Sequence, residues 1–247
     1  MSGVTENIAI RAESMVKDYA RDWLGRRWRA LDGLSFTVTC GQICGLVGPN
    51  GSGKSTTLKI LAGLASLSGG RCTMLPDRSK GEISPGRIAY LPETPSFPTH
   101  LTGTEVLTHF ARLSGLERSE AAMAVSAALG RVDLGAGSMR RTDEYSKGMR
   151  QRLGLAQALL RRADLVLLDE PAAGLDPLGV EILGNIIREL KSSGVTVVLS
   201  SHFLPQIEEW CDSLVMLVQG RALFRGTQSE VRTAGGLHRI YVARMKS

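Results

Sequence analysis

The chain has 247 residues, with 30 Lys or Arg against 24 Asp or Glu, so its formal net charge is +6. Hydrophobic residues make up 43% and charged residues 22% of the chain, which excludes a disulfide-stapled miniprotein and argues against global disorder. The four cysteines form no CxxC pair and no His-Cys cluster. We therefore expect reduced, buried thiols rather than a metal site.

No stretch of the sequence reaches the roughly 18 apolar residues that a membrane-spanning helix needs. The N-terminus lacks a basic region followed by a long apolar segment, so we expect no secretory signal. The chain is expected to be cytosolic or held at a membrane by another protein. Its basic balance suits nucleotides, nucleic acid or acidic lipid headgroups, and it does not choose among them.

The elements predicted first along the chain form an antiparallel β piece. Residues 8–17 and 34–39 read as strands, with turn signals at Asp32-Gly33 and Cys40-Gly41. Short apolar runs further along indicate strands that are buried on both faces. These runs are residues 43–47, 165–168, 195–199 and 214–218.

A helix is predicted at residues 181–190, between two of these strands, which makes a βαβ unit and implies a parallel sheet. Residues 103 to about 160 carry apolar residues at helical spacing and read as an inserted helical subdomain. The predicted fold class is α/β with an antiparallel β piece. We expect residues 1–247 to form one domain, with a core at about 1–92 and 162–247 and a helical subdomain at about 93–161.

A glycine-rich segment follows the strand at residues 43–47 and leads into a helix, in the pattern GxxxxGK[ST]. Glycines let the backbone approach a polyphosphate, and the inward N–H groups and the helix dipole attract its charge. Lys54 should reach the β- and γ-phosphates, while Ser55 should join a Mg²⁺ shell. The predicted nucleotide-binding residues of this P-loop are Gly48, Pro49, Asn50, Gly51, Ser52, Gly53, Lys54, Ser55 and Thr56.

Two acidic residues, Asp169 and Glu170, end the apolar strand at residues 165–168. A carboxylate at this edge of a sheet suits Mg²⁺, which prefers hard oxygen ligands, so Asp169 is the predicted metal partner. Glu170 is then placed to orient or deprotonate an attacking water. A small hydroxyl and a glycine, Ser146 and Gly148, open a later helix and suggest a second anion site, one that serves the nucleotide of another copy of the chain.

Read in order, these motifs resemble the nucleotide-binding domain of ABC transporters over essentially the whole chain. The resemblance implies that Tyr19 stacks on adenine and that His202 contacts the γ-phosphate. It also implies that Asp176 belongs to the D-loop, which links two sites in a head-to-tail dimer. The trans signature that would close on the partner's nucleotide is Ser146, Lys147, Gly148 and Met149.

Two positions depart from the family's pattern. Glu93 stands where the family usually has a Q-loop Gln, so it is a candidate metal ligand and catalytic residue that also adds negative charge near the γ-phosphate. The signature reads YSKGM instead of LSGGQ, and Lys147 could add favourable charge near the partner's phosphates. These departures resemble exporters that pair separate ATPase and permease chains.

Two segments leave alternatives open. The basic insertion at residues 21–29 has two interpretations. It is either a solvated hairpin or a functional segment. In the second case, Trp23 or Trp28 covers adenine, or the arginines bind anionic lipid headgroups. Residues 94–98 either contact a membrane partner through Phe97 or fold that side chain onto their own domain.

The sequence thus predicts an ATPase that uses ATP and Mg²⁺, dimerises head-to-tail and drives a membrane permease. It would lie peripherally at the cytoplasmic face of the inner membrane, with no nucleic acid partner expected. The alternatives are a soluble ABC-type ATPase, a slow-hydrolysing regulator or, from another class, a P-loop kinase.

Overall fold

The computed structural model describes residues 7–20, 27–74 and 88–245. Its central sheet has the strand order β5-β6-β7-β3-β8-β9, with β9 antiparallel to β8 and the other neighbours parallel. All residues of β3, β6 and β7 are buried, as expected for parallel strands covered on both faces. The bounds are β3 Ile43–Val47, β5 Ile88–Leu91, β6 Leu165–Leu168, β7 Thr196–Ser201, β8 Ser213–Val218 and β9 Arg221–Thr227.

The antiparallel piece is a second sheet of order β2-β1-β4, formed by β1 (Ile8–Ala20), β2 (Arg27–Thr39) and β4 (Gly69–Met74). The turn predicted at Asp32-Gly33 is wrong, because β2 runs through it. Gly33 has φ 73, and the β1–β2 register shifts beside it, between Met15 and Val16. The glycine therefore makes a β-bulge, which absorbs the positive φ while the strand stays paired.

The predicted βαβ unit is confirmed by α5 (Pro177–Ser192), which connects β6 to β7. The P-loop leads directly into α1 (Lys54–Leu61). The C-terminal helices α6 (Leu204–Trp210), α7 (Gln228–Thr233) and α8 (Leu237–Met245) were not predicted. No helix in the described ranges has the length and apolar character to span a membrane.

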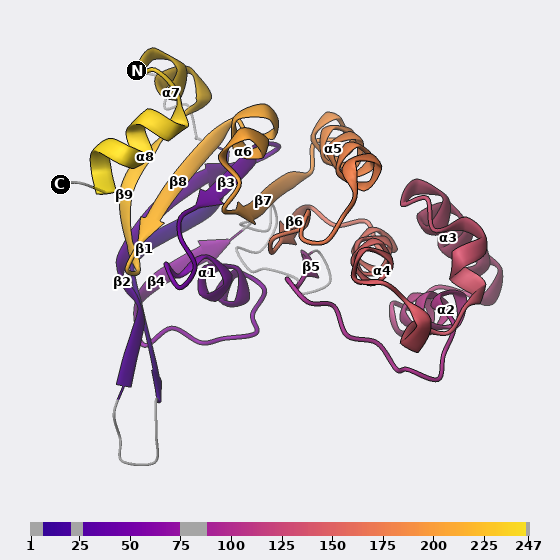
Figure 1. Ribbon diagram of the computed structural model, residues 1–247. Coiled ribbons are helices and arrows are strands. Elements are labelled where there is room, and N and C mark those ends of the chain that lie inside the picture. The colour runs from indigo at the N-terminus through magenta and orange to yellow at the C-terminus, as the bar shows by residue number, and fades with distance from the viewer. Residues whose placement is uncertain (1–6, 21–26, 75–87, 246–247) are drawn as a thin grey trace.

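The helical insertion contains α2 (Gly103–Leu113), α3 (Arg118–Arg131) and α4 (Lys147–Leu159), with short 3₁₀ turns at Gly135–Met139 and Thr142–Glu144. Figure 1 shows these helices on the opposite side of the molecule from the β1–β2 hairpin. Leu107, Val125 and Leu153 belong to the same hydrophobic cluster as Leu168 and Leu199 of the central sheet. The insertion is therefore anchored to the sheet through a continuous apolar core.

Candidate active site

Four parallel strands bring the predicted functional segments to one edge of the central sheet. The P-loop follows β3, Glu93 follows β5, Asp169-Glu170 follows β6, and His202 follows β7. Ligands of open α/β sheets bind at this carboxyl edge. A pocket of about 450 Å³ lies there, lined by Trp28, Asn50, Gly51, Ser52, Gly53, Lys54, Ser55, Thr56, Glu93, Lys147, Glu170, Ala173 and His202.

The P-loop is held in a shape that needs glycine. Gly53, the N-cap of α1, has φ 108, and a Cβ there would lie 2.8 Å from the Ala30 carbonyl oxygen and 2.7 Å from Leu31 Cδ2. The Lys54 side chain is buried, and its Nζ donates to the carbonyl oxygens of Gly48 at 2.8 Å and Pro49 at 3.2 Å. The lysine thus folds back across the loop, with its charge inside the anion cradle.

Two of the three predicted metal ligands, Ser55 and Asp169, lie at hydrogen-bond distance from each other. Ser55 Oγ donates to Asp169 Oδ1 at 3.0 Å, and Asp169 is buried. Glu93 is exposed on the wall of the same pocket. The described residues contain no cluster of three or more His, Cys, Asp or Glu that could hold a metal alone. These hard oxygens fit Mg²⁺, which keeps waters and takes most of its other ligands from substrate phosphates.

Glu170 adopts a backbone conformation that is uncommon for a non-glycine residue, with φ 46. Its N–H donates to Ser200 Oγ at 2.8 Å, and its Oε2 lies 2.8 Å from His202 Nδ1. Oε1 is buried, lies 3.6 Å from Lys54 Nζ and has no hydrogen-bond partner among the described residues. Such conformations persist where neighbours hold them, often at functional sites. One carboxylate oxygen is therefore fixed by His202, while the other makes no hydrogen bond within the described ranges and faces Lys54.

Two residues beside the acidic pair, Ser200 and Tyr90, were not among the predicted site residues. Ser200 Oγ donates to Asp169 Oδ1 at 2.7 Å as well as accepting from Glu170 N. Its signal was a pair of hydroxyl residues, Ser200 and Ser201, directly after the strand predicted at residues 195–199. Burial and then the nearby Asp169 carboxylate raise the pKa of Tyr90 in β5 above its usual range, so the phenol stays neutral.

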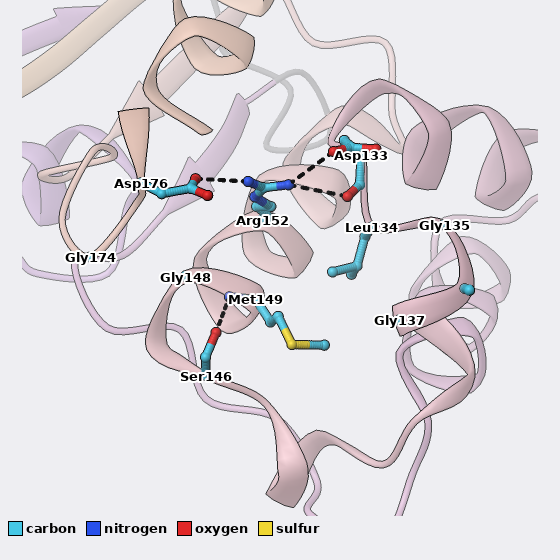
Figure 2. Close-up of a pocket in the computed structure, with 11 residues that line it drawn as sticks. Asp133, Leu134, Gly135, Gly137, Ser146, Gly148, Met149, Arg152, Gly174 and Asp176 are labelled. Carbon is cyan, nitrogen blue, oxygen red and sulfur yellow. Dashed lines mark hydrogen bonds and ion pairs between the residues drawn. The ribbon is translucent and has the colours of Figure 1, made fainter. Parts of the chain in front are cut away.

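Three signature residues line a different pocket. Figure 2 shows Ser146, Gly148 and Met149 in this pocket of about 460 Å³, which also contains Gly174 and Asp176. Ser146 Oγ accepts from Met149 N at 3.1 Å and caps α4. The two pockets share no lining residue.

Arg152 of α4 ties the signature to the D-loop. Its guanidinium lies 2.9 Å from Asp176 Oδ1 and 3.3 Å from Asp133 Oδ2 (Figure 2). Asp176 caps α5 by accepting from Gly179 N at 2.9 Å. This hydrogen bond, followed by that from Arg152, holds the pKa of Asp176 below its usual range. The D-loop carboxylate therefore stays charged and joined to the signature helix.

Comparison with known proteins decides the family. Residues 31–173, more than half of the chain, match the family described as ABC transporter. The chain belongs to this family. This ABC cassette is 39% identical over 211 residues to an uncharacterized ABC transporter ATP-binding protein of Synechocystis sp., covering 85% of the cassette and 60% of the relative.

Two further proteins are similar to the cassette. A fluoroquinolones export ATP-binding protein of Mycobacterium tuberculosis is 37% identical over 216 residues, covering 86% of the cassette and 70% of that protein. A solved dimeric ATP-binding cassette in a post-hydrolysis state, bound to ADP and Pi, shares the fold with a TM-score of 0.80 at 20% identity. It covers 89% of the cassette and 98% of the solved chain. The cassette spans only about 60% of the length of the first relative.

The aromatic residue at the pocket of the cassette is Trp28. It is 46% exposed and lines the P-loop pocket, whereas Tyr19 is not among the lining residues. The two rings are stacked, with centroids 6.0 Å apart and an interplanar angle of 20°. Lys17 Nζ lies 4.8 Å from the Tyr19 centroid. Tyr19 thus lies beside the aromatic surface that the pocket presents, and Trp23 lies outside the described residues.

The segment at residues 94–98 packs against its own cassette. Phe97 is partly buried and contacts the main hydrophobic cluster. A Cβ on Gly154 of α4 would lie 2.7 Å from Pro95 Cγ, so the segment lies closely on this helix. Of the two alternatives for Phe97, the structure favours the one in which the ring folds onto its own domain.

Proposed function

We propose that the cassette binds ATP with Mg²⁺ and hydrolyses it as the ATPase subunit of a transporter. The observation that carries this proposal is the single pocket where Lys54, Ser55, Glu93, Glu170 and His202 converge. When bound, Mg²⁺ neutralises charge on the β- and γ-phosphates, and its protein ligands would be Ser55 and Asp169, with Glu93 on the wall.

The side chains divide the work of hydrolysis. Lys54 binds the phosphates, and the P-loop N–H groups orient them. Glu170 accepts a proton from the attacking water through its unbonded Oε1. His202 holds the other carboxylate oxygen and is exposed enough to reach the γ-phosphate as well. We also propose that the chain divides into a core, at about residues 1–92 and 162–247, and a helical subdomain at about residues 93–161.

We further propose a head-to-tail dimer. Ser146, Gly148 and Met149 line a pocket that is separate from their own P-loop pocket, so a second copy must bring them to a nucleotide. The shared fold of a cassette solved as a dimer supports this arrangement. Closure then depends on the γ-phosphate, because contacts across the interface exist only while it is present.

Trp28 is proposed as the main platform for adenine, with Tyr19 supporting it. Because stacking of a base on an aromatic ring contributes about 1–3 kcal/mol, we expect Trp28→Ala to weaken the binding of ATP and ADP by roughly tenfold. Tyr19→Ala should have a smaller effect, and Tyr19→Phe, which keeps the stack, should have almost none. Calorimetric titration checks the order. A larger loss of affinity in Tyr19→Ala than in Trp28→Ala would show that Tyr19 is the main platform for adenine.

The partner is proposed to be an integral-membrane permease, which places the cassette peripherally at the cytoplasmic face of the inner membrane. The similar protein named for fluoroquinolone export supports this assignment. The test is affinity purification from membranes, followed by reconstitution of the cassette with the multi-span protein that copurifies. We expect that protein, and neither DNA nor ribosomes, to stimulate turnover. Stimulation by DNA or ribosomes alone would favour the soluble ABC-type ATPase, and no stimulation would favour the slow-hydrolysing regulator.

A further inference from the structure

Lys147 lines a different pocket from the other signature residues. Ser146, Gly148 and Met149 line the signature pocket, but Lys147 lines the P-loop pocket of its own chain. A family signature acts on the partner's nucleotide, so this placement gives Lys147 a different geometry from its neighbours in sequence.

The D-loop supports the lysine stem along this path. A Cβ on Gly174 would lie 2.7 Å from Lys147 Cδ, 2.8 Å from Cγ and 3.1 Å from Cε. Gly174 also has φ 81, so a side chain there is disfavoured by both strain and space. The methylene groups of Lys147 therefore lie over the Gly174 backbone. The residue lines the P-loop pocket together with Ala173, Glu170 and His202.

The charges in this pocket leave the Lys147 ammonium free for a ligand. Lys54 is buried against the Gly48 and Pro49 carbonyl oxygens and lies close to Glu170. Lys147 is exposed and has no hydrogen bond or ion pair within the described part of the chain. Glu93, on the same wall, is likewise exposed and unpaired there. Lys147 and Glu93, which stand where the family usually has Gly and Gln, therefore add one cation and one anion to the same pocket.

We propose that Lys147 binds the terminal phosphate of the ATP held by its own chain and offsets the negative charge of Glu93. This inference rests on the proposed function, because it assumes that the P-loop pocket holds ATP. It differs from the trans role that the signature motif implies, since a single chain contains both the lysine and the nucleotide that it contacts.

The test measures ATP and ADP binding to the full-length chain by calorimetry in EDTA, where hydrolysis cannot proceed, at a concentration at which sedimentation shows a monomer. Lys147→Ala should weaken ATP binding by about twofold to fivefold, in the range expected for one partly exposed charge contact. The affinity for ADP, which lacks the terminal phosphate, should fall by less. Lys147→Arg should restore most of the affinity, and higher salt should shrink the difference from wild type.

Matched variants separate this role from others. Lys59→Ala removes the same charge from an exposed position of α1 that lines neither pocket, and should bind ATP like wild type. Glu93→Gln should tighten ATP binding, and the double variant Glu93→Gln/Lys147→Ala should lie near wild type.

The outcomes distinguish the two proposals. Wild-type affinity in Lys147→Ala, together with lost affinity in Lys54→Ala, would overturn the cis role of Lys147 alone. The cis role would also be overturned if Lys147→Ala weakened ATP binding only in a magnesium-bound dimer. Wild-type affinity in Lys54→Ala would instead contradict the proposed function.

Discussion

Replacing Glu170 with Gln is expected to lower ATP turnover by roughly a hundredfold to ten-thousandfold, the usual contribution of a general base. The amide keeps the shape of the side chain and its proximity to His202, but it cannot take up the proton of the attacking water. ATP binding should survive because Lys54 and the P-loop remain intact. A phosphate-release assay measures the rate, and calorimetry measures the binding.

The same variant should accumulate as an ATP-bound dimer, since the γ-phosphate that joins the two chains persists. Sedimentation with saturating Mg²⁺ and ATP tests this state. Glu189→Gln is the matched control, because Glu189 pairs with Arg131 at 2.9 Å outside the site and its change should leave turnover intact. An unaltered rate in Glu170→Gln would remove the general-base role. A variant that stays monomeric, with or without its membrane partner, would refute the shared site.

Lys54→Ala is expected to weaken the binding of both ATP and ADP by about tenfold to a hundredfold, the range for losing a hydrogen bond to a charged group. The substitution removes the cation from inside the P-loop, and it leaves the buried Glu170 carboxylate without its nearest positive charge. Both changes make the free energy of placing the phosphates beside Glu170 less favourable. Calorimetric titration measures the affinity.

A melting curve without nucleotide shows whether Lys54→Ala still folds. Lys54→Arg, which keeps the charge but not the compact ammonium, indicates how much of the loss is geometric. Lys59→Ala serves again as the control for net charge. If the folded Lys54→Ala protein binds ATP like wild type, the P-loop does not hold the phosphates.

Much of the fold follows from local sequence patterns. The strands at 43–47 and 165–168 match β3 and β6 residue for residue, and those near 196 and 214 are displaced by only one or two residues. Buried parallel strands need continuous apolar runs, so their signal is strong. β4 and β9 were missed because none of their residues is fully buried and neither strand has a continuous apolar run of four or more residues.

The sequence by itself determined the P-loop, the acidic pair after β6 and the signature, because each motif is contiguous and its chemistry requires those residue types. Only the tertiary structure decided that Trp28 lines the pocket, that Ser200 braces Asp169, and that Lys147 lines its own chain's pocket. These relations join residues that are distant in the chain, or depend on which way one side chain leaves a helix. Spacing along a sequence does not encode them, since packing between elements sets which surfaces meet.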